Sequence, residues 1–172
     1  MTAWLWPPLL GERVLLRTPR AGDEAALIEM ATDARVRAYV GGPVDRNVAV
    51  ANAAETVTNP AWGQFVITDL STGVVIGSGD LARKRGPWEV SYQLRHAYWG
   101  KGLGSEAVTL ICAWFFAHTD DDLLIAVTQQ ANVRSRRLLA RVGAVHAGSF
   151  EAYGRMQERF EFRRSWVAAI DG

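Results

Sequence analysis

The sequence predicts a single-domain α/β protein in which a mixed sheet carries helices on both faces. Its 172 residues correspond to about one domain in length. Hydrophobic residues make up 49% and charged residues 22%, as is typical of folded globular chains. Helical and strand periodicities follow one another in the order β-α-α-β-β-β-α-β-α-β-β. No repeat or linker divides the chain, so residues 1–172 are taken as one domain.

The first half predicts one strand, two helices and then three strands. Asp23 and Asp45 are suited to cap the two helices, and Asn59-Pro60 ends the second. The alternation Gly77-Ser78-Gly79 predicts a close backbone approach or a bulge. The predicted strands are residues 13–18, 64–69, 74–81 and 88–94.

The second half predicts an amphipathic helix over residues 104–118 and an almost wholly apolar strand over 123–128, buried on both faces. A second helix over 132–142 ends at Gly143. Two strands, 145–153 and 158–166, then flank a turn at Gly154. The last strand closes with Phe162, Trp166 and Val167, which could pair across a homodimer.

Composition and charge exclude several classes of function. The net charge of +1 gives no reason to expect nucleic acid or an anionic membrane as a partner. No apolar run approaches a membrane span, and the short apolar residues 1–8 lack the basic start of a signal peptide. The histidines have no metal-ligand spacing, so no metal is predicted.

The cysteine and tryptophan residues give expectations for the cellular compartment and for the packing of the core. The single Cys112 cannot form an internal disulfide, which favours the cytoplasm. It lies in an apolar helical run and is interpreted as a small buried hydrophobe rather than a nucleophile. Trp4, Trp6 and Trp62 could fill the core, line a pocket or form a subunit contact.

Residues 98–107 carry the clearest chemical signal. Glycines at positions 100, 102 and 104 alternate between a strand and the first turn of a helix. Backbone N–H groups of residues 101–105 would converge on an anion at the helix N-terminus, which predicts a pyrophosphate cradle. Ser105 and Ala107 stand where a dinucleotide fingerprint would need glycine. The alternative is a tight turn with no ligand.

This segment resembles the coenzyme A motif of the GNAT superfamily of N-acyltransferases, Arg/Gln-x-x-Gly-x-Gly/Ala. Trp99 departs from the Arg/Gln position, but the run Tyr98-Trp99-Gly100-Lys101-Gly102, followed by Glu106-Ala107, resembles the branch of ribosomal-protein N-terminal alanine acetyltransferases. Further matches across residues 11–166 are Glu89-Val90-Ser91-Tyr92, Asn132-x-x-Ser135 with Leu138, Leu139, Arg141 and Gly143, and residues 13–17 with Asp23.

The resemblance implies a mostly antiparallel sheet that splays between two parallel central strands, here residues 89–94 and 123–128. The pantetheine arm of acetyl-CoA would lie between them. Backbone groups near Tyr92, Gln93 and Leu94 would bind this arm, and one N–H would face the thioester oxygen. The cradle would comprise Trp99, Gly100, Lys101, Gly102, Leu103, Gly104 and Ser105. Asn132 and Ser135 would contact the coenzyme arm, and of the arginines at 134, 136, 137 and 141 we select Arg137 for the 3′-phosphate.

The catalytic candidates follow from the two proton transfers that the reaction needs. Glu89 is the first candidate for the base, directly or through water, unless it pairs with an arginine. Tyr92 on the same strand is expected to share the face of Glu89, where it could pass a proton or pack. Ser135 is the candidate partner of the leaving thiolate, unless it bonds its own helix backbone. Leu139 stands where many family members place a tyrosine acid.

The resemblance therefore implies an acetyl-CoA-dependent N-acetyltransferase without a metal. The acceptor would be a small amino compound or a peptide N-terminus, bound by residues 4–10, residues 39–59 and the final hairpin around residues 153–158. These segments hold few acids (Asp45, Glu55, Glu151 and Glu158), which disfavours polyamines and aminoglycosides. The alternatives are a non-catalytic acyl-CoA-binding module and a transferase of a bulkier acyl group.

Overall fold

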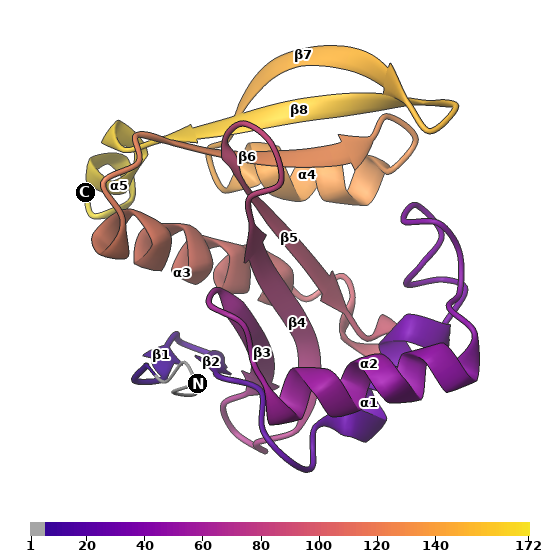
Figure 1. Cartoon of the computed structure of the whole chain (residues 1–172). Coiled ribbons are helices and arrows are strands. Elements are labelled where there is room, and N and C mark those ends of the chain that lie inside the picture. Colours follow the sequence, from indigo (N-terminus) through magenta and orange to yellow (C-terminus); the bar gives the residue numbers. More distant parts are fainter. Residues whose placement is uncertain (1–5) are drawn as a thin grey trace.

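The computed structural model describes residues 6–172, which form an eight-stranded mixed sheet with helices on both faces (Figure 1). The strand order is β1-β2-β3-β4-β5-β6-β8-β7. The strands are β1 (Leu9–Leu10), β2 (Val14–Arg17), β3 (Gln64–Asp69), β4 (Val75–Ala82), β5 (Trp88–Leu94), β6 (Leu123–Gln129), β7 (Val145–Ala152) and β8 (Arg155–Arg163). The helices are α1 (Glu24–Thr32), α2 (Arg46–Thr58), the short η1 (His96–Tyr98), α3 (Leu103–His118), α4 (Val133–Arg141) and α5 (Ser165–Ile170). The interpretation of Trp4 lies outside the described residues.

Strands β5 and β6 form the parallel pair of this otherwise antiparallel sheet, and they pair only where they begin. Trp88 is opposite Leu124, and Glu89 is opposite Ile125. Beyond these positions β5 continues along β4, whereas β6 pairs with β8 over its whole length. The predicted splay is therefore confirmed: the sheet divides into two arms that diverge from the start of this pair (Figure 1).

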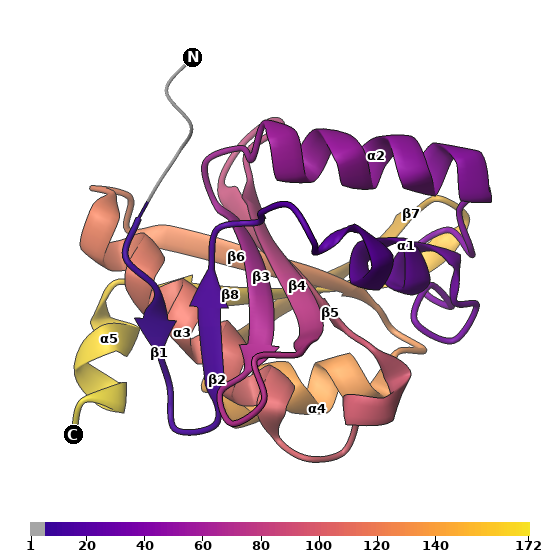
Figure 2. The same ribbon diagram turned by 90° about the horizontal axis from the view of Figure 1, so that it is seen from below.

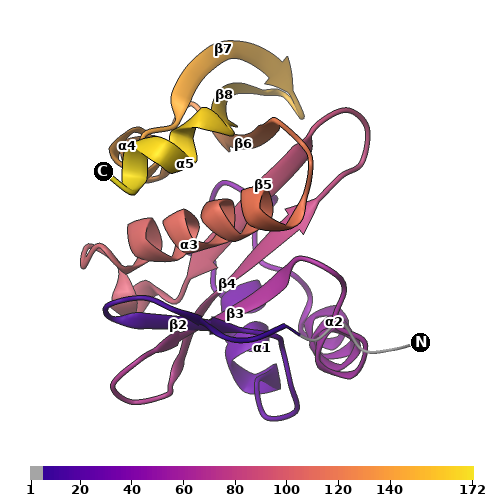
Figure 3. The same ribbon diagram turned by 90° about the vertical axis from the view of Figure 1, so that its left-hand side faces the viewer.

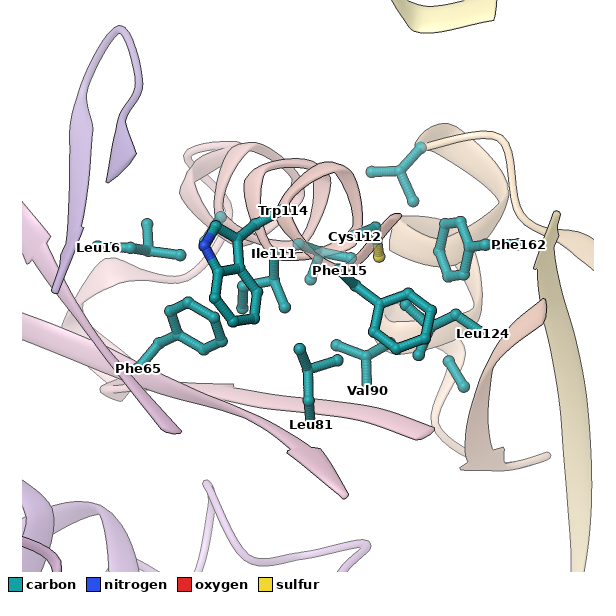
Figure 4. Close-up of a cluster of buried hydrophobic side chains, with 14 of the residues drawn as sticks. Leu16, Phe65, Leu81, Val90, Ile111, Cys112, Trp114, Phe115, Leu124 and Phe162 are labelled. Atoms are coloured by element: carbon teal, nitrogen blue, oxygen red, sulfur yellow. The ribbon is translucent and has the colours of Figure 1, made fainter. Parts of the chain in front are cut away.

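Helix α3 fills the wedge between the two arms (Figure 3). Its side chains Ile111 and Phe115 are fully buried. Figure 4 shows Phe65 and Val90 from one arm and Leu124 and Phe162 from the other gathered around this helix, alongside other core residues. Burial of each such side chain stabilises the fold by roughly 1.5–3 kcal/mol. Helix α3 therefore joins the two arms through its packing, and its width sets the distance between them.

Cys112 and the tryptophans belong to this core. Cys112 is fully buried, and burial raises the pKa of its thiol, which confirms the interpretation as a small hydrophobe. Trp6 and Trp62 pack against Trp114, with ring centroids 5.8 and 5.3 Å away. Of the three roles considered for these two tryptophans, the structure supports core packing.

Helices α1 and α2 cover the opposite face of the sheet (Figure 2). The carboxylate of Asp45 caps α2 as predicted, accepting hydrogen bonds from the backbone N–H groups of Asn47 and Val48. Asp23 precedes α1, but its side chain makes no cap bond. It forms instead a bidentate ion pair with Arg17, with both N···O distances 2.8 Å. The predicted capping role of Asp23 is therefore wrong, because the guanidinium of β2 takes both carboxylate oxygens.

Strand β4 is confirmed as a site of close approach. A Cβ at Gly77 would collide with the Gln93 carbonyl of β5, and one at Gly79 would collide with Ile111 of α3. A register irregularity also lies between Ile67 and Thr68 of the neighbouring β3. The glycines let α3 and β5 lie against this strand.

The C-terminal strand differs from the prediction. Strand β8 ends at Arg163, and Trp166 lies in helix α5, where its indole N–H donates to the Val142 carbonyl at 2.7 Å. Both edges of β8 are already paired, with β6 and with β7. Dimer pairing through a last strand that extends to Trp166 and Val167 is therefore wrong, because β7 rather than β8 is the edge of the sheet.

The Arg17–Asp23 pair gives a stability prediction. Both side chains are nearly buried, 11% and 4% exposed, so Asp23→Asn leaves a guanidinium without its counter-charge. We expect this change to lower the free energy of unfolding by about 3 kcal/mol. The Arg164–Asp122 pair supplies the control, because the Asp122 side chain is 82% exposed and Asp122→Asn should leave stability nearly unchanged. Urea denaturation of both variants measures the difference, and equal losses would contradict it.

Candidate active site

A cavity of about 500 Å³ lies where the end of β5, the start of α3 and helix α4 meet. We call it the first cavity. Every predicted coenzyme-binding residue except Lys101 lines it: Gln93, Leu94, Trp99, Gly100, Gly102, Leu103, Gly104, Ser105, Asn132, Ser135 and Arg137. Val36, Tyr39 and Val40, from the segment between α1 and α2, also line it, and the sequence patterns did not place them there.

The glycine-rich loop has the backbone that an anion cradle requires. Gly100 and Gly102 have φ values of 73° and 77°, in the left-handed region that glycine adopts without strain. Gly102 is the N-cap of α3, and no side chain caps this helix. The N–H groups of its first turn therefore have no partner within the helix and are available to a phosphate.

A bracket formed by Arg13 and Glu106 holds this loop. The Arg13 guanidinium donates to the Lys101 carbonyl at 2.7 Å and to Glu106 at 3.2 Å. The same carboxylate accepts the backbone N–H groups of Arg13 and Val14. Because the C=O and N–H of a trans peptide point in opposite directions, the Gly102 N–H faces away from Arg13. Lys101 thus fixes the loop through its backbone, which accounts for its absence from the cavity lining.

The polar and charged groups of the first cavity suit a polyphosphate. The Ser105 hydroxyl is buried and has no hydrogen-bond partner among residues 6–172, as expected of a group that meets a ligand. Arg134, Arg137 and Arg141 line the cavity, and no carboxylate of the described chain does. Three guanidinium groups beside uncapped helix N–H groups complement the phosphates of coenzyme A.

Arg134 and Trp99 form a pair that the sequence motifs did not reveal. The guanidinium carbon of Arg134 lies 3.3 Å from the centroid of the Trp99 ring, a cation–π contact. The indole N–H donates to the Leu94 carbonyl at 2.9 Å, which fixes the ring. Trp99 occupies the Arg/Gln position of the motif and carries no charge. Arg134 of α4, which stacks on the Trp99 ring, places a cation beside this position.

The backbone of β5 presents alternate residues to the open gap. The Arg95 N–H donates to Ile76 of β4 at 2.8 Å, and the Gln93 carbonyl faces Gly77 of the same strand. In an antiparallel pair, bonding residues alternate with residues whose N–H and C=O point the other way. The backbones of Tyr92 and Leu94 therefore face the gap beside β6. The Gln93 backbone faces β4 instead, although the residue lines the cavity.

Tyr92 and Ser135 meet across the first cavity. Their hydroxyl oxygens are 2.7 Å apart, and either can donate. Burial raises the pKa of Tyr92 to about 12, although the bond to Ser135 opposes the shift. The Ser135 N–H donates to the Asn132 side chain at 3.2 Å, so Asn132 is the N-cap of α4 as predicted. The Ser135 hydroxyl thus bonds a second element, not its own helix.

Glu89 lies at the closed end of the gap, where β5 and β6 still pair. It is half-buried, and burial raises the pKa of its carboxyl, while the charge of Lys84 lowers it. The expectation that Tyr92 shares its strand face is wrong, because the two residues are three apart and side chains alternate. Glu89 faces the side of α1 and α2, and it does not line the first cavity.

A second cavity of about 290 Å³ lies between helix α2 and strands β3, β4 and β5. Tyr92 and Gln93 line both cavities, so the two meet at the end of β5. Of the segments predicted to bind an acceptor, only α2 lines it, through Ala49, Asn52, Ala53 and Thr56. Tyr39 lines the first cavity instead, and Tyr153 is 98% exposed at a hairpin turn.

Asp80 of β4 is the residue of this region that sequence reasoning missed. It lines the second cavity, and burial raises the pKa of its carboxyl, although the Leu81 backbone N–H opposes the shift. No sequence motif includes Asp80. The one local indication of a role is that an acidic residue lies inside a half-buried strand. A shifted carboxyl in a cleft is a candidate functional group.

No helix within residues 6–172 combines the length and apolar character that crossing a bilayer requires. In the same residues, no three His, Cys, Asp or Glu side chains gather closely enough to hold a metal ion.

Comparisons with known proteins agree with this geometry. Residues 13–145 match the model of the acetyltransferase (GNAT) domain. A GNAT-family acetyltransferase from Bacillus anthracis superposes with a TM-score of 0.82 at 18% identity, over 92% of this chain and 99% of that one. The ribosomal-protein-S5-alanine acetyltransferase from Vibrio fischeri gives 0.73 at 18% identity, over 92% and 97%. An aminoglycoside acetyltransferase in complex with coenzyme A gives 0.75 at 15% identity, over 92% and 99%. At these identities the likeness concerns the fold.

The cradle gives a prediction for coenzyme A binding. Gly102→Val places a β-branched residue at a φ of 77° beside the first cavity and strains the loop. We expect its affinity for coenzyme A, measured by calorimetry, to fall at least about tenfold, which corresponds to about 1.4 kcal/mol. Gly86→Val is the matched control, because Gly86 has a φ of 91° in a turn that does not line the cavity. Unchanged affinity in the Gly102 variant would place the cofactor elsewhere.

Proposed function

We propose, from the premise that this chain belongs to the GNAT acetyltransferase family, that it moves an acetyl group from acetyl-CoA to a primary amine by direct attack in a ternary complex. Acetyl-CoA is the donor, and the enzyme is an N-acetyltransferase. The observation that carries the finer proposal is the meeting of two cavities at Tyr92 and Gln93. One has the charge and backbone suited to the donor, and the other leaves room for an acceptor.

The donor would lie with its phosphates at the glycine-rich loop and its arm beside β5. The first-turn N–H groups of α3 and the Ser105 hydroxyl would receive the diphosphate. Arg137 is proposed for the 3′-phosphate, and Arg134 for the motif position that Trp99 occupies. The gap-facing backbone of Leu94 and Tyr92 would bind the pantetheine amides.

The reaction forms a C–N bond and breaks the thioester C–S bond. The ammonium of the acceptor first loses a proton to a base, and its nitrogen then attacks the carbonyl carbon. The Tyr92 N–H, nearest the closed end of the gap, is proposed to donate to the oxygen that becomes negative. When the carbonyl re-forms, the sulfur leaves with the electron pair of the C–S bond, and the proton that the nitrogen loses on becoming an amide neutralises the thiolate.

Ser135 and Tyr92 would serve the leaving sulfur as one hydrogen-bonded unit. A free thiol has a pKa near 8.5, so a thiolate cannot fully deprotonate a phenol whose pKa is about 12. The Ser135 hydroxyl is a still weaker acid, so neither group loses its proton to the sulfur; we assign Ser135 the hydrogen bond to sulfur and Tyr92 the bond that orients Ser135. This pair takes the place of the tyrosine acid that many members carry where Leu139 is fully buried here.

Glu89 remains the proposed base, acting through water. Its half-buried carboxyl lies on the strand face that leads to the second cavity, and burial raises its pKa towards the range in which a carboxylate accepts a proton readily. A water molecule would connect it to the amine, since Glu89 itself lines neither cavity.

The acceptor is proposed to be a small amino compound or a peptide N-terminus. The second cavity measures about 290 Å³, which suits one small molecule or the first residue of a chain. The proposal includes a cytoplasmic location, supported by the neutral, buried thiol of Cys112. The proposed likeness to ribosomal-protein alanine acetyltransferases rests on Tyr98-Trp99-Gly100-Lys101-Gly102.

Thiol release from acetyl-CoA tests the function directly. The protein is incubated with acetyl-CoA and separate panels of primary amines, amino acids and peptides, and acetylated products are identified by mass spectrometry. Release above background hydrolysis with at least one amine is the expected result. Tight coenzyme A binding with no turnover on any panel would leave a non-catalytic binding module, and turnover only with longer acyl donors would change the donor.

The Tyr92–Ser135 bond gives a graded prediction for turnover. Ser135→Ala removes the hydroxyl assigned to the sulfur, and we expect kcat to fall about 10²-fold, within the usual range for a lost proton-transfer or hydrogen-bonding group. Tyr92→Phe removes only the orienting bond and should lower kcat less. Affinity for coenzyme A should fall much less than kcat in both variants. A larger loss for Tyr92→Phe than for Ser135→Ala would reverse the assigned roles.

A further inference from the structure

We infer that Asp80 binds the ammonium group of the acceptor in the second cavity, and that this acceptor is a compact primary amine whose remaining part is uncharged. The inference rests on the proposed function and adds the class of the acceptor and the residue that recognises it. Asp80 lies outside every motif that indicated the donor site, and its position in the second cavity is the main ground for the inference.

The sheet register directs Asp80 into the second cavity. On β4 it is opposite Gln64 of β3 and Ser91 of β5, and all three line the cavity. The neighbouring Gly79 faces α3, so side-chain alternation turns Asp80 towards the opposite face, which α2 covers. Asn52 and Thr56 of α2 close this side.

Asp80 is the single carboxylate that residues 6–172 contribute to the cavity lining. The other lining side chains are apolar or neutral and polar, and Tyr92 is a phenol. Among residues 6–172, Asp80 has no cation at ion-pair distance. A half-buried carboxylate without a counter-charge is costly, and an ammonium from outside the chain would supply the missing partner.

The two cavities thus have opposite charge. The first is lined by arginines and by no carboxylate, whereas the second is lined by one carboxylate and by no cation of the described chain. An anionic donor and a cationic acceptor would therefore be drawn to different sides of β5. They would meet at Tyr92 and Gln93, where the amide of Gln93 donates to Ser78 at 3.0 Å and is held in place.

The neutral part of the lining sets the acceptor class. Asn52, Thr56, Gln64 and Ser91 can bond an amide, a hydroxyl or a carbonyl, but none can neutralise a second charge. A carboxylate on the acceptor would meet Asp80 as a like charge, and a second ammonium would lose its water without a partner. Monoamines and amino amides are therefore favoured over amino acids and diamines.

Burial supports this assignment. It raises the pKa of Asp80, which shows that the charged carboxyl is poorly solvated there. Glu89 is the charged residue of the neighbouring strands that lies nearest to Asp80 on the same face, diagonally across on β5. The residues directly opposite Asp80, Gln64 and Ser91, are neutral. Asp80 is assigned recognition of the ammonium, and the proton passes to the base proposed above.

A matched set of four-carbon amines tests the charge rule. Butylamine carries one cation, γ-aminobutyrate adds a carboxylate, and putrescine adds a second ammonium. Binding to the protein saturated with coenzyme A is followed by NMR, through the methyl groups of Ala49 and Ala53 in the cavity wall. We expect butylamine to bind most tightly and Asp80→Asn to weaken it about tenfold.

Asp121→Asn is the control, because this exposed carboxylate lies outside both cavities and should not alter binding. Steady-state thiol release with the best amine gives a second readout. Asp80→Asn should raise KM for the amine about tenfold with a smaller change in kcat, and Asp80→Glu should restore part of the loss. Glu89→Gln should instead lower kcat.

The outcomes separate this inference from the proposed function. If butylamine binds in an Asp80-dependent manner but no amine releases thiol, the recognition site stands and the catalytic proposal fails. If amines are acetylated and Asp80→Asn changes neither binding nor KM, the inference is overturned while the enzyme remains. Equal binding of all three amines would overturn the acceptor class.

Discussion

The whole site depends on two neighbouring strands of the sheet that pair only where they begin and then separate. Strands β5 and β6 pair at two positions and then separate, because α3 places Ile111, Cys112 and Phe115 in the wedge between the arms. Buried backbone groups normally require partners, so an interrupted ladder at the centre of a sheet is stable only if something else completes it. Here the interruption leaves the Tyr92 and Leu94 backbones facing the gap. Arginines line the first cavity beside it, and Asp80 is the one carboxylate that the described residues contribute to the second.

The surroundings of the gap are held by contacts between distant parts of the chain. Arg13, which immediately precedes β2, fixes the glycine-rich loop through the Lys101 carbonyl and Glu106. Arg134 of α4 stacks on Trp99. These contacts bring α4 and the start of β2 to one loop, so the loop geometry is a property of the fold and not of the glycines alone. Because these contacts already hold the loop in one conformation, a ligand with charges at fixed positions can bind without a large cost for ordering the loop.

Much of the fold could be predicted because its signals are local. Helical periodicity over residues 104–118, the Asn132 cap and the glycine alternation each depend on neighbours in sequence, and the structure contains all of them. Prediction failed where a partner in another element outcompeted the expected local contact. Asp23 was expected to cap α1 but bonds Arg17, and Trp166 was expected in a strand but begins a helix that anchors to Val142.

The sequence alone predicted the order of helices and strands from β2 to β8, the glycine-rich loop before α3 and the family resemblance, since these are encoded in residue type and short spacing, whereas β1, η1 and α5 were not predicted. Only the tertiary structure decided which side chains meet. Tyr92 reaches Ser135 across 43 positions, and Asp80 enters a cavity shared with α2 because β4 has one particular register against β3 and β5. A shift of that register by one residue would turn Asp80 to the other face. No local pattern encodes this choice, because it is set by the packing of the whole sheet against α3.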